Sequence, residues 1–302
     1  MSLVGSSTEL VRVKQNLKKQ KRRLLWRRVL VNKGIVIGGL MMAGLTLLAL
    51  IGPLVTPHDP FAMVVEERLK PPSSQHLLGT DNFGRDLLTR IVYGAGVSLG
   101  IGLTVAFLAC LIGMIFGLLA SYYRALDEIL MRICDGLMAI PGVLLAIALI
   151  AALGPLQQNV IIALTIVFIP NVARVVRSAA IVIREETYIE AVRAQGASPW
   201  RIIVLHIAPN TISPLVVQAS FIFADAIITE AALSFLGAGI PAPNPSWGNI
   251  LGDGKVVIFK AWWMTVFPGA LIMLSVLGLN LLGDGLRDLI DPHLSKGRKS
   301  SH

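Results

Sequence analysis

The sequence predicts an all-α, polytopic membrane protein with six transmembrane helices, and composition and charge placement support this class. Of its 302 residues, 54% are hydrophobic and 15% are charged, whereas a soluble domain carries about 25% charged residues. The charges also lie between long uncharged stretches. Each stretch can supply a helix of about 20 residues, the length that crosses a bilayer core.

Residues 1–33 are basic and predict a cytoplasmic N-terminal tail. They hold ten Lys and Arg against one acid, Glu9, so their charge of +9 equals the formal net charge of the whole chain. A basic tail can bind nucleic acid, but this tail runs directly into an apolar segment, which the positive-inside rule explains better. We therefore expect anionic lipid headgroups beside the tail and no nucleic acid.

Residues 34–58 contain no Asp, Glu, Lys or Arg and predict the first transmembrane helix. Residues 59–95 are then an external segment. Within it, residues 78–93 predict an amphipathic helix at the membrane interface, with apolar residues on one face and Arg85, Asp86, Thr89 and Arg90 on the other. This helix is expected to contact an external binding protein through Asp81, Arg85 and Asp86. The alternative is a structural lead-in to the second span, with Asp81 as its cap.

Residues 96–285 predict a core with five further spans. The second is centred near residues 97–119 and is followed by a charged loop at 124–135. The uncharged stretch 136–173 is too long for one crossing at about 1.5 Å per residue. A turn at Gly154–Asn159 divides it into the third and fourth helices. The last two spans are expected at residues 211–236 and 261–283, and they lead to a cytoplasmic tail at 286–302.

The polar segment 184–210 lies between the fourth and fifth spans and is expected on the cytoplasmic side. Thr187 and Glu190 fit a capping box at the start of one short helix, and Gly196 can end that helix in a left-handed conformation. Ser198 and Pro199 fit the start of a second helix, which Pro209-Asn210 would end. Its apolar stripe consists of Ile202, Ile203, Leu205 and Ile207. The segment predicts a helix–turn–helix knob that fits a groove on another protein; the alternative is a solvated loop.

Five sequence motifs in this chain are long enough to be compared with known families. They are Glu190-Ala191-x-x-x-x-Gly196 with Pro209; Leu78-Gly79-Thr80-Asp81-Asn82-Phe83-Gly84-Arg85-Asp86; Glu230-Ala231-Ala232-Leu233-Ser234-Phe235-Leu236-Gly237; Pro245-Ser246-Trp247-Gly248; and Gly283-Asp284-Gly285-Leu286-Arg287-Asp288. The first group resembles the EAA coupling motif of ABC importer permeases. Together they resemble the C-type permease subunit of the dipeptide, oligopeptide and nickel importer family. Val192, Ala208 and Gly96 depart from the usual pattern.

This resemblance implies a five-helix permease core with a peripheral first helix, in the bacterial inner membrane, with both termini cytoplasmic. It implies import of di- or oligopeptides with a homologous permease partner, two ATPase subunits and an external solute-binding protein. ATP and Mg would bind to the ATPase subunits, so neither a bound cofactor nor an enzymatic activity is expected of this chain. Glutathione-like peptides and nickel are alternative cargoes. A stand-alone channel or secondary transporter is the alternative from another class.

Candidate functional residues fall into two further sets. The resemblance assigns coupling to the ATPases to Glu190, Ala191, Arg193, Gly196, Ala197 and Pro209. Asp225 and Glu230 are the acids inside a predicted span, and carboxylates at that depth are costly and usually face a bundle interior or a wet path. We expect them to line the translocation path; the alternative is that they are hydrogen-bonded inside the bundle.

Catalytic and metal motifs are not recognisable in the sequence. Cys110 and Cys134 form no C-x-x-C pair, and the five histidines are scattered, so no metal site is expected. Gly248 through Lys255 lacks the spacing of a phosphate-binding loop. A membrane enzyme is therefore not favoured.

Overall fold

The computed structural model describes residue 20 and residues 27–290, and every regular element in this part of the chain is a helix. The long helices are α2 (Lys33–Val55), α3 (Leu87–Tyr122), α6 (Gln157–Arg184), α9 (Ala208–Phe235) and α11 (Trp263–Ile290). The short ones are η1 (Val65–Glu67), α4 (Arg124–Met138), α5 (Gly142–Leu153), α7 (Thr187–Ala194), α8 (Pro199–Ile202), η2 (Ile203–Ile207) and α10 (Trp247–Lys255). Most of the two predicted tails lies outside the described residues.

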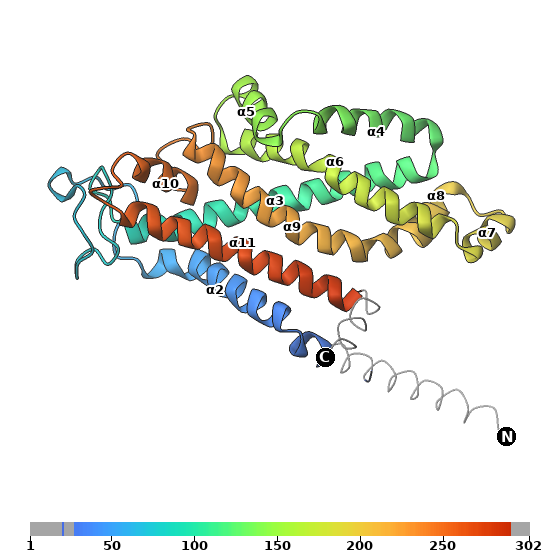
Figure 1. Ribbon diagram of the computed structural model, residues 1–302, viewed down its shortest axis with the longest axis horizontal. Helices are drawn as coiled ribbons and strands as arrows, with labels where there is room; N and C mark the ends of the chain where they lie inside the picture. The colour runs from blue at the N-terminus through green and yellow to red at the C-terminus, as the bar shows by residue number, and fades with distance from the viewer. Residues whose placement is uncertain (1–19, 21–26, 291–302) are drawn as a thin grey trace, which may run out of the picture.

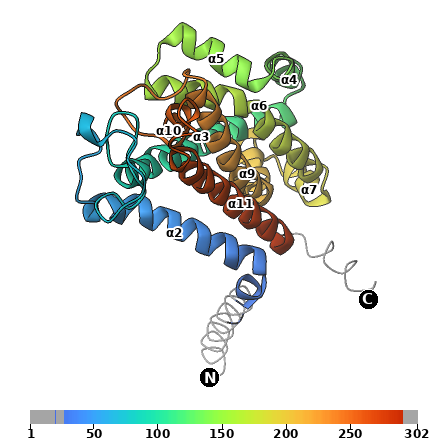
Figure 2. The same ribbon diagram turned by 60° about the vertical axis from the view of Figure 1, so that its left-hand side comes forward.

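The helices form an elongated bundle in which α3, α6 and α9 make the centre (Figure 1). Helix α2 lies along α11 at one edge, and α4 and α5 lie beyond α6 on the opposite side (Figures 1 and 2). The all-helical class and the peripheral first helix are therefore confirmed. One end of the bundle carries α7 and α8, together with the start of α2 and the end of α11. The other end carries α10 and the segment between α2 and α3.

Small residues allow the central helices to approach one another closely. A Cβ atom placed on Gly113 of α3 would lie only 2.5 Å from the Cβ atom of Val172 on α6. The neighbouring Ala109 and Ala173 are fully buried. Close backbone approach through Gly and Ala is the usual basis of helix packing in a bilayer, where the lipid tails are as apolar as the side chains. The predicted core is thus held by small-residue contacts between α3 and α6.

Five helices in the described part are long and apolar enough to cross a membrane, and a sixth crossing exists only if α4 and α5 together count as one. The pair is bent by 94° at the break. The third helix is expected to run from about residue 136 to the turn at Gly154, and residues 124–135 are expected to form a charged loop. The structure instead has a helix over 124–138 and a break before α5, so both expectations are corrected. Pro141 lacks an N–H donor and disfavours a helical conformation of the residue before it, so the chain breaks there. Helix α5, with its 12 residues, is about 18 Å long, short of the bilayer core.

The charged segment 124–135 lies instead in α4, which ion pairs hold against α6. Arg177 donates through Nε to Asp127 Oδ1 at 2.5 Å, and Arg174 pairs with Asp135. The charges that marked this segment as a loop are therefore the polar face of an amphipathic helix. The helical spacing of the charges in 124–135 predicts this polar face, whereas the number of charges alone does not.

Helix α3 begins at Leu87, and its N-cap is Asp86, whose Oδ2 accepts a hydrogen bond from the Thr89 N–H at 2.8 Å. Residues 87–93 of the predicted amphipathic helix are therefore the first turns of α3, as in the alternative of a lead-in to the second span. Residues 78–86 are not helical, and Asp81 is not the cap. The polar face assigned to that helix is buried rather than presented to the interface, because residues 56–86 fold over it. We call residues 56–86 the α2–α3 loop.

The predicted helix end at Pro209 is also wrong. Helix α8, the π-helical segment η2 and α9 follow one another without a break. In η2 the N–H of Ala208 donates to the carbonyl of Ile203, five residues earlier. The regular bonding to the fourth preceding residue is thus already replaced where Pro209 enters, so a residue without an N–H is accommodated.

Candidate functional site

The predicted coupling segment forms a sharp bend at one end of the bundle (Figure 1). We call residues 187–202 the elbow. Helix α7 is preceded by Glu186 as N-cap, and no side chain caps it, so the predicted capping box of Thr187 and Glu190 is absent. The Glu186 carbonyl instead accepts the N–H of Ile189 at 2.9 Å.

The turn between α7 and α8 has the geometry that the sequence predicted for Gly196. Its φ is +80°, a left-handed conformation that glycine adopts without steric cost. The Gly196 N–H donates to the Arg193 carbonyl at 3.0 Å and the Ala197 N–H to the Val192 carbonyl at 3.3 Å. These two bonds form a Schellman motif, which satisfies carbonyls at the end of α7. Helix α8 then begins with Pro199 after Ser198, as predicted.

The elbow has a buried apolar base and an exposed surface. Ile189, Ile202 and Ile207 are fully buried in the main hydrophobic core. Leu205 is 59% exposed, so it does not belong to the buried stripe to which we assigned it. The predicted coupling residues lie outside this base: Ala197 is half-buried and the others are exposed, namely Glu190, Ala191, Arg193, Gly196 and Pro209. Pro209 lies in α9 rather than in the elbow.

The elbow contacts the end of α3, and a neighbouring hydrogen bond joins the ends of α3 and α6. The Arg193 guanidinium lies 5.9 Å from the ring centroid of Tyr122, the last residue of α3, and Arg184, the last residue of α6, donates to the Ser121 carbonyl. Tyr122, Arg184, Glu185, Glu190 and Arg193 line a hollow of about 440 Å³. Arg193 thus links α7 to the end of α3, and Arg184 links the ends of α6 and α3 beside it.

The two acids predicted for the translocation path have different surroundings. Asp225 is exposed on α9, and its path role stays a prediction. Glu230 is fully buried, and it accepts hydrogen bonds from Ser234 at 2.7 Å and Ser98 at 3.3 Å. Ser98 in turn accepts from the Trp247 N–H at 3.2 Å. Glu230 therefore joins α3, α9 and the start of α10 inside the subunit, which is the structural alternative considered for it.

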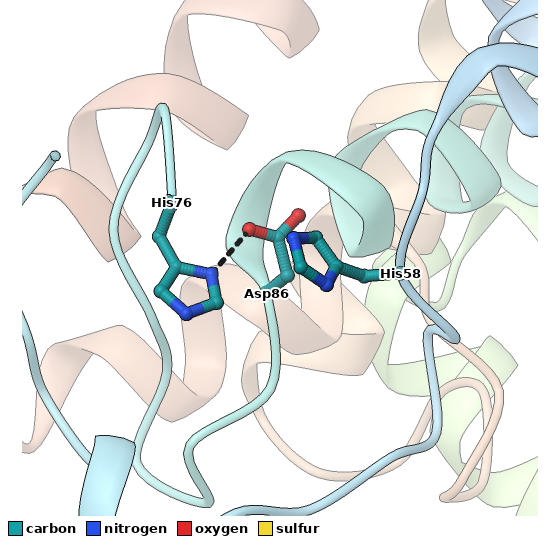
Figure 3. A group of neighbouring side chains, drawn as sticks. All are labelled: His58, His76 and Asp86. Atoms are coloured by element: carbon teal, nitrogen blue, oxygen red, sulfur yellow. Dashed lines mark hydrogen bonds and ion pairs between the residues drawn. The ribbon is translucent and has the colours of Figure 1, made fainter. Parts of the chain in front are cut away.

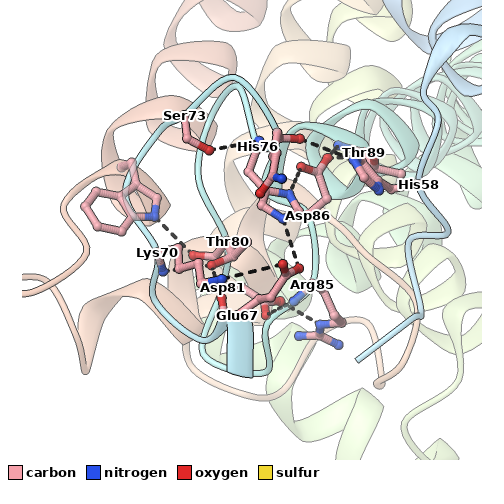
Figure 4. Close-up of polar contacts among 12 residues, drawn as sticks. His58, Glu67, Lys70, Ser73, His76, Thr80, Asp81, Arg85, Asp86 and Thr89 are labelled. Atoms are coloured by element: carbon pink, nitrogen blue, oxygen red, sulfur yellow. Dashed lines mark hydrogen bonds and ion pairs between the residues drawn. The ribbon is translucent and has the colours of Figure 1, made fainter. Parts of the chain in front are cut away.

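The three residues predicted to contact a binding protein are buried in the α2–α3 loop (Figure 4). Asp81, Arg85 and Asp86 are 1%, 3% and 5% exposed. Asp81 Oδ2 lies 2.6 Å from Arg85 Nε and 3.4 Å from Arg90 Nε. Asp86 is bonded instead to His76 and Thr89. The burial of these three side chains does not fit the predicted direct contact with a binding protein.

The loop also brings together His58, His76 and Asp86, which lie apart in the sequence (Figure 3). His76 Nδ1 lies 2.9 Å from Asp86 Oδ1, and His76 Nε2 lies 3.0 Å from Glu67 Oε2. The ring of His58 lies 5.1 Å from that of His76, centroid to centroid. The proximity of these side chains depends on the path of an irregular loop, and no sequence spacing predicts it.

Two carboxylates at this end have shifted pKa values. The hydrogen bond from His76 lowers the pKa of Glu67 below its ordinary value, and Lys70 adds to this effect. Burial raises the pKa of Asp253 in α10, although Arg85 lies 3.6 Å away and opposes the shift. Asp253, Arg85, Arg90 and Lys255 share a cleft of about 480 Å³. The cleft is thus lined by charges of both signs.

The long apolar helices define the class of this protein as a polytopic membrane protein. Residues 109–296 match the family described as the binding-protein-dependent transport system inner membrane component. Residues 22–72 match the N-terminal transmembrane domain of oligopeptide transport permease C. The chain belongs to the family of binding-protein-dependent transport permeases, and the resemblance stated from its motifs is confirmed.

Three relatives align with most of this chain. A putative peptide transport system permease protein of Brucella suis is 53% identical over 83% of this chain and 84% of its own length. A dipeptide transport system permease protein of Alkalihalophilus pseudofirmus is 48% identical over 82% of each chain. A glutathione transport system permease protein of Pectobacterium atrosepticum is 43% identical over 90% of this chain and 91% of its own length.

A solved structure is similar in fold. It is an inward-facing conformation of the MetNI methionine ABC transporter, and its TM-score is 0.55 at 23% sequence identity. The match covers 66% of this chain and 95% of the other.

Proposed function

We propose that this chain is a permease subunit of an ATP-driven ABC importer for di- or oligopeptides and forms half of the translocation path. The observation that carries the proposal is the elbow, an exposed bend on a fully buried isoleucine base. Family membership supports the class, and the names of the relatives support the cargo. The similar glutathione permease supports glutathione-like peptides as a second cargo class. Nickel has no such support among the relatives described, and neither has a stand-alone channel.

The remaining parts of the machine are supplied by other subunits in this proposal. A homologous permease completes the path, two ATPase subunits bind ATP and Mg, and an external solute-binding protein delivers the peptide. The elbow lies at the same end of the bundle as the start of α2 and the end of α11 (Figure 1). With the basic N-terminal tail held inside by the positive-inside rule, this end faces the cytoplasm, and the α2–α3 loop and α10 face outward.

Coupling works mechanically in this arrangement. An ATPase holds the exposed face of α7 around Glu190 and Ala191, and ATP-driven closure moves that face. The Schellman turn at Gly196 and the buried Ile189 make α7 move with its base rather than bend away. The contacts of Arg193 with Tyr122 and of Arg184 with Ser121 pass the movement to α3 and α6. ATP binding and the arrangement of the spans are then two linked equilibria.

The test replaces Gly196 by Trp in the complex purified from membranes. Nothing lies within 4 Å of a Cβ atom at Gly196, so the core of the subunit is kept. The φ of +80° strains the turn locally, and the new side chain obstructs the docking face. We expect the complex to hydrolyse ATP without concentrating peptide in proteoliposomes that contain the binding protein. The matched control is Gly136→Trp in α4, where a Cβ atom also meets nothing within 4 Å. Normal uptake by the Gly196 variant would contradict the coupling role.

A second measurement tests the contact itself. A cysteine at Ala191, which is exposed on α7, should form a cross-link to an ATPase subunit in native membranes. A cysteine at exposed Val182 on α6 serves as the comparison. Purification of the chain alone, followed by sustained concentrative uptake without any ATPase, would overturn the whole assignment.

A further inference from the structure

Two imidazole rings and one carboxylate converge in the α2–α3 loop (Figure 3). His58, His76 and Asp86 each offer one ligand atom, and these atoms lie within 4.8 Å of one another. In a tetrahedral site with bonds of about 2.0–2.1 Å, neighbouring ligand atoms are about 3.3 Å apart. His76 Nδ1 and Asp86 Oδ1, now 2.9 Å apart, would open slightly, and the His58 ring would move inward. These adjustments are within the reach of side-chain rotation.

The two buried ligands are held from behind by other groups (Figure 4). His76 Nε2 lies 3.0 Å from Glu67 Oε2, so an N–H donated there leaves Nδ1 with a lone pair. Asp86 Oδ2 accepts from the N–H and the hydroxyl of Thr89 at 2.8 and 2.7 Å, which leaves Oδ1 to face His76. A carboxylate behind a ligating histidine is the usual outer shell of a metal site and fixes its tautomer and orientation.

The third ligand is on the solvent side and gives access. His58 is exposed, whereas His76 and Asp86 are each 5% exposed. His58 Nε2 lies 3.3 Å from the Gln75 carbonyl oxygen, a further neutral oxygen beside the ring. An ion can therefore enter past His58, and a water molecule can take the remaining position. Two imidazoles with one carboxylate suit Zn²⁺ and similar first-row ions better than Mg²⁺ or Ca²⁺, which prefer oxygen ligands.

We propose that the α2–α3 loop binds one Zn²⁺-class divalent ion through His58, His76 and Asp86, with Glu67 as the outer-shell partner of His76. The ion is resident and is not cargo, because its ligands lie in the segment between two helices rather than in a path through the bundle. His58 follows the end of α2 at Val55, and Asp86 caps the start of α3. The bound ion therefore ties the peripheral helix α2 to the central helix α3.

The test uses the full-length, tag-free chain together with the subunits that co-purify with it, after treatment with a chelator. Zn²⁺ is titrated against a chromophoric competitor, and Co²⁺ is used for its visible absorption. We expect one ion per chain at this site and a rise in the unfolding temperature on Zn²⁺ addition. His58→Gln should weaken Zn²⁺ binding by at least about tenfold, and Glu67→Gln by about 10- to 100-fold, the range for outer-shell partners.

The control is His206→Gln, because His206 lies at the opposite end of the bundle in η2 and should leave binding unchanged. Replacing His58 should not unfold the chain, since the side chain is exposed, and elution volume checks this. Zn²⁺ affinity equal to wild type in His58→Gln overturns the proposal, as does loss of binding in His206→Gln alone. Absence of Zn²⁺ binding to the wild-type complex shows that the cluster is only a hydrogen-bonded network. Loss of this site leaves the proposed coupling role untouched, because that role is measured at Gly196.

Discussion

The α2–α3 loop and the elbow lie at opposite ends of one bundle and keep their shapes by different means. In the loop, buried side chains bind one another: Asp81, Arg85 and Asp86 are at most 5% exposed. In the elbow, the shape comes from backbone hydrogen bonds at the turn of Gly196 and from one buried anchor on α7, Ile189. The charged groups of the elbow, Glu190, Arg193 and Arg201, are exposed.

This difference separates buried charges that are paired within the chain from exposed charges that a partner protein can bind. Buried charges need partners within the chain, since an unpaired charge away from water is very costly. The buried charges of the loop, Asp81 and Arg85, meet this need internally, whereas Glu66 and Arg68 at its surface are exposed. The elbow leaves its polar groups to solvent, so a second protein can bind them without first breaking contacts inside this subunit. A coupling surface is therefore expected at the elbow rather than at the loop.

The largest effect is expected from Asp81→Ala in the loop. The substitution leaves Arg85 and Arg90, 3% and 2% exposed, without the carboxylate that pairs with both. Removing one partner of a buried ion pair costs about 3–5 kcal/mol. The unfolding temperature in detergent should fall strongly, and the loop should become sensitive to protease. The control is Asp59→Ala, an exposed carboxylate that accepts only from the Phe61 N–H, with an effect within about 0.5 kcal/mol. Equal unfolding temperatures for the two variants would show that the buried ion pair does not hold the loop, and the loop would then no longer differ from the elbow in this respect.

The second prediction extends the comparison to the interior near the loop end. Glu230→Ala leaves Ser98 and Ser234 without their buried acceptor, a loss of about 1–3 kcal/mol. Glu230→Gln keeps one acceptor oxygen and should recover part of that stability. The unfolding temperatures of the two variants and the wild type give the order. If both variants have the unfolding temperature of the wild type, Glu230 is not a structural link. A role in the translocation path would then explain this residue better.

The sequence predicts best what is local or set by length. Both ends of α2 and the start of α11 lie within a few residues of the predicted spans. An uncharged stretch of bilayer length is most stable as a transmembrane helix, so its position follows from the sequence. The left-handed turn at Gly196 is predicted because that conformation depends on one residue type. The family is predicted from motifs that are several residues long and occur in order.

What the sequence did not predict depends on tertiary contacts. The sequence predicts a third helix that continues past Pro141 and a helix that ends at Pro209, whereas the structure breaks the first and continues the second. Both outcomes depend on how neighbouring carbonyls are satisfied, which a proline alone does not reveal. The burial of Asp81 and Arg85 and the meeting of His58 with His76 depend on the path of an aperiodic loop. Charged residues in such a loop look exposed until the loop is folded.

The third prediction concerns the elbow directly. Gly196→Ala places a Cβ atom in a left-handed residue, which costs about 1–2 kcal/mol. Because few buried contacts hold the tip, this cost should appear as local opening rather than global unfolding. Amide hydrogen exchange should accelerate in residues 187–199, while the unfolding temperature stays near that of the wild type. Gly136→Ala is the matched control, since its φ is not positive and its Cβ meets nothing within 4 Å. A fall in the unfolding temperature like that of Asp81→Ala would show that the elbow is as tightly built as the loop.

The smallest effect is a pH dependence at the edge of the loop. Burial raises the pKa of Asp253 above its ordinary value of 3.8, Asp81 raises it further, and Arg85, Arg90 and Lys255 oppose the shift. A raised pKa means that the folded state holds the proton more tightly, so this contribution to stability is present below 3.8 and is lost as the pH rises through the higher folded value. Asp253→Asn removes that loss. The difference in unfolding temperature, variant minus wild type, should therefore increase from acidic to neutral pH, and only slightly, because the Asp253 side chain is 37% exposed and water screens its charge. A decrease over the same range would mean that the three cations outweigh burial and that this carboxylate is a further ionic link of the loop.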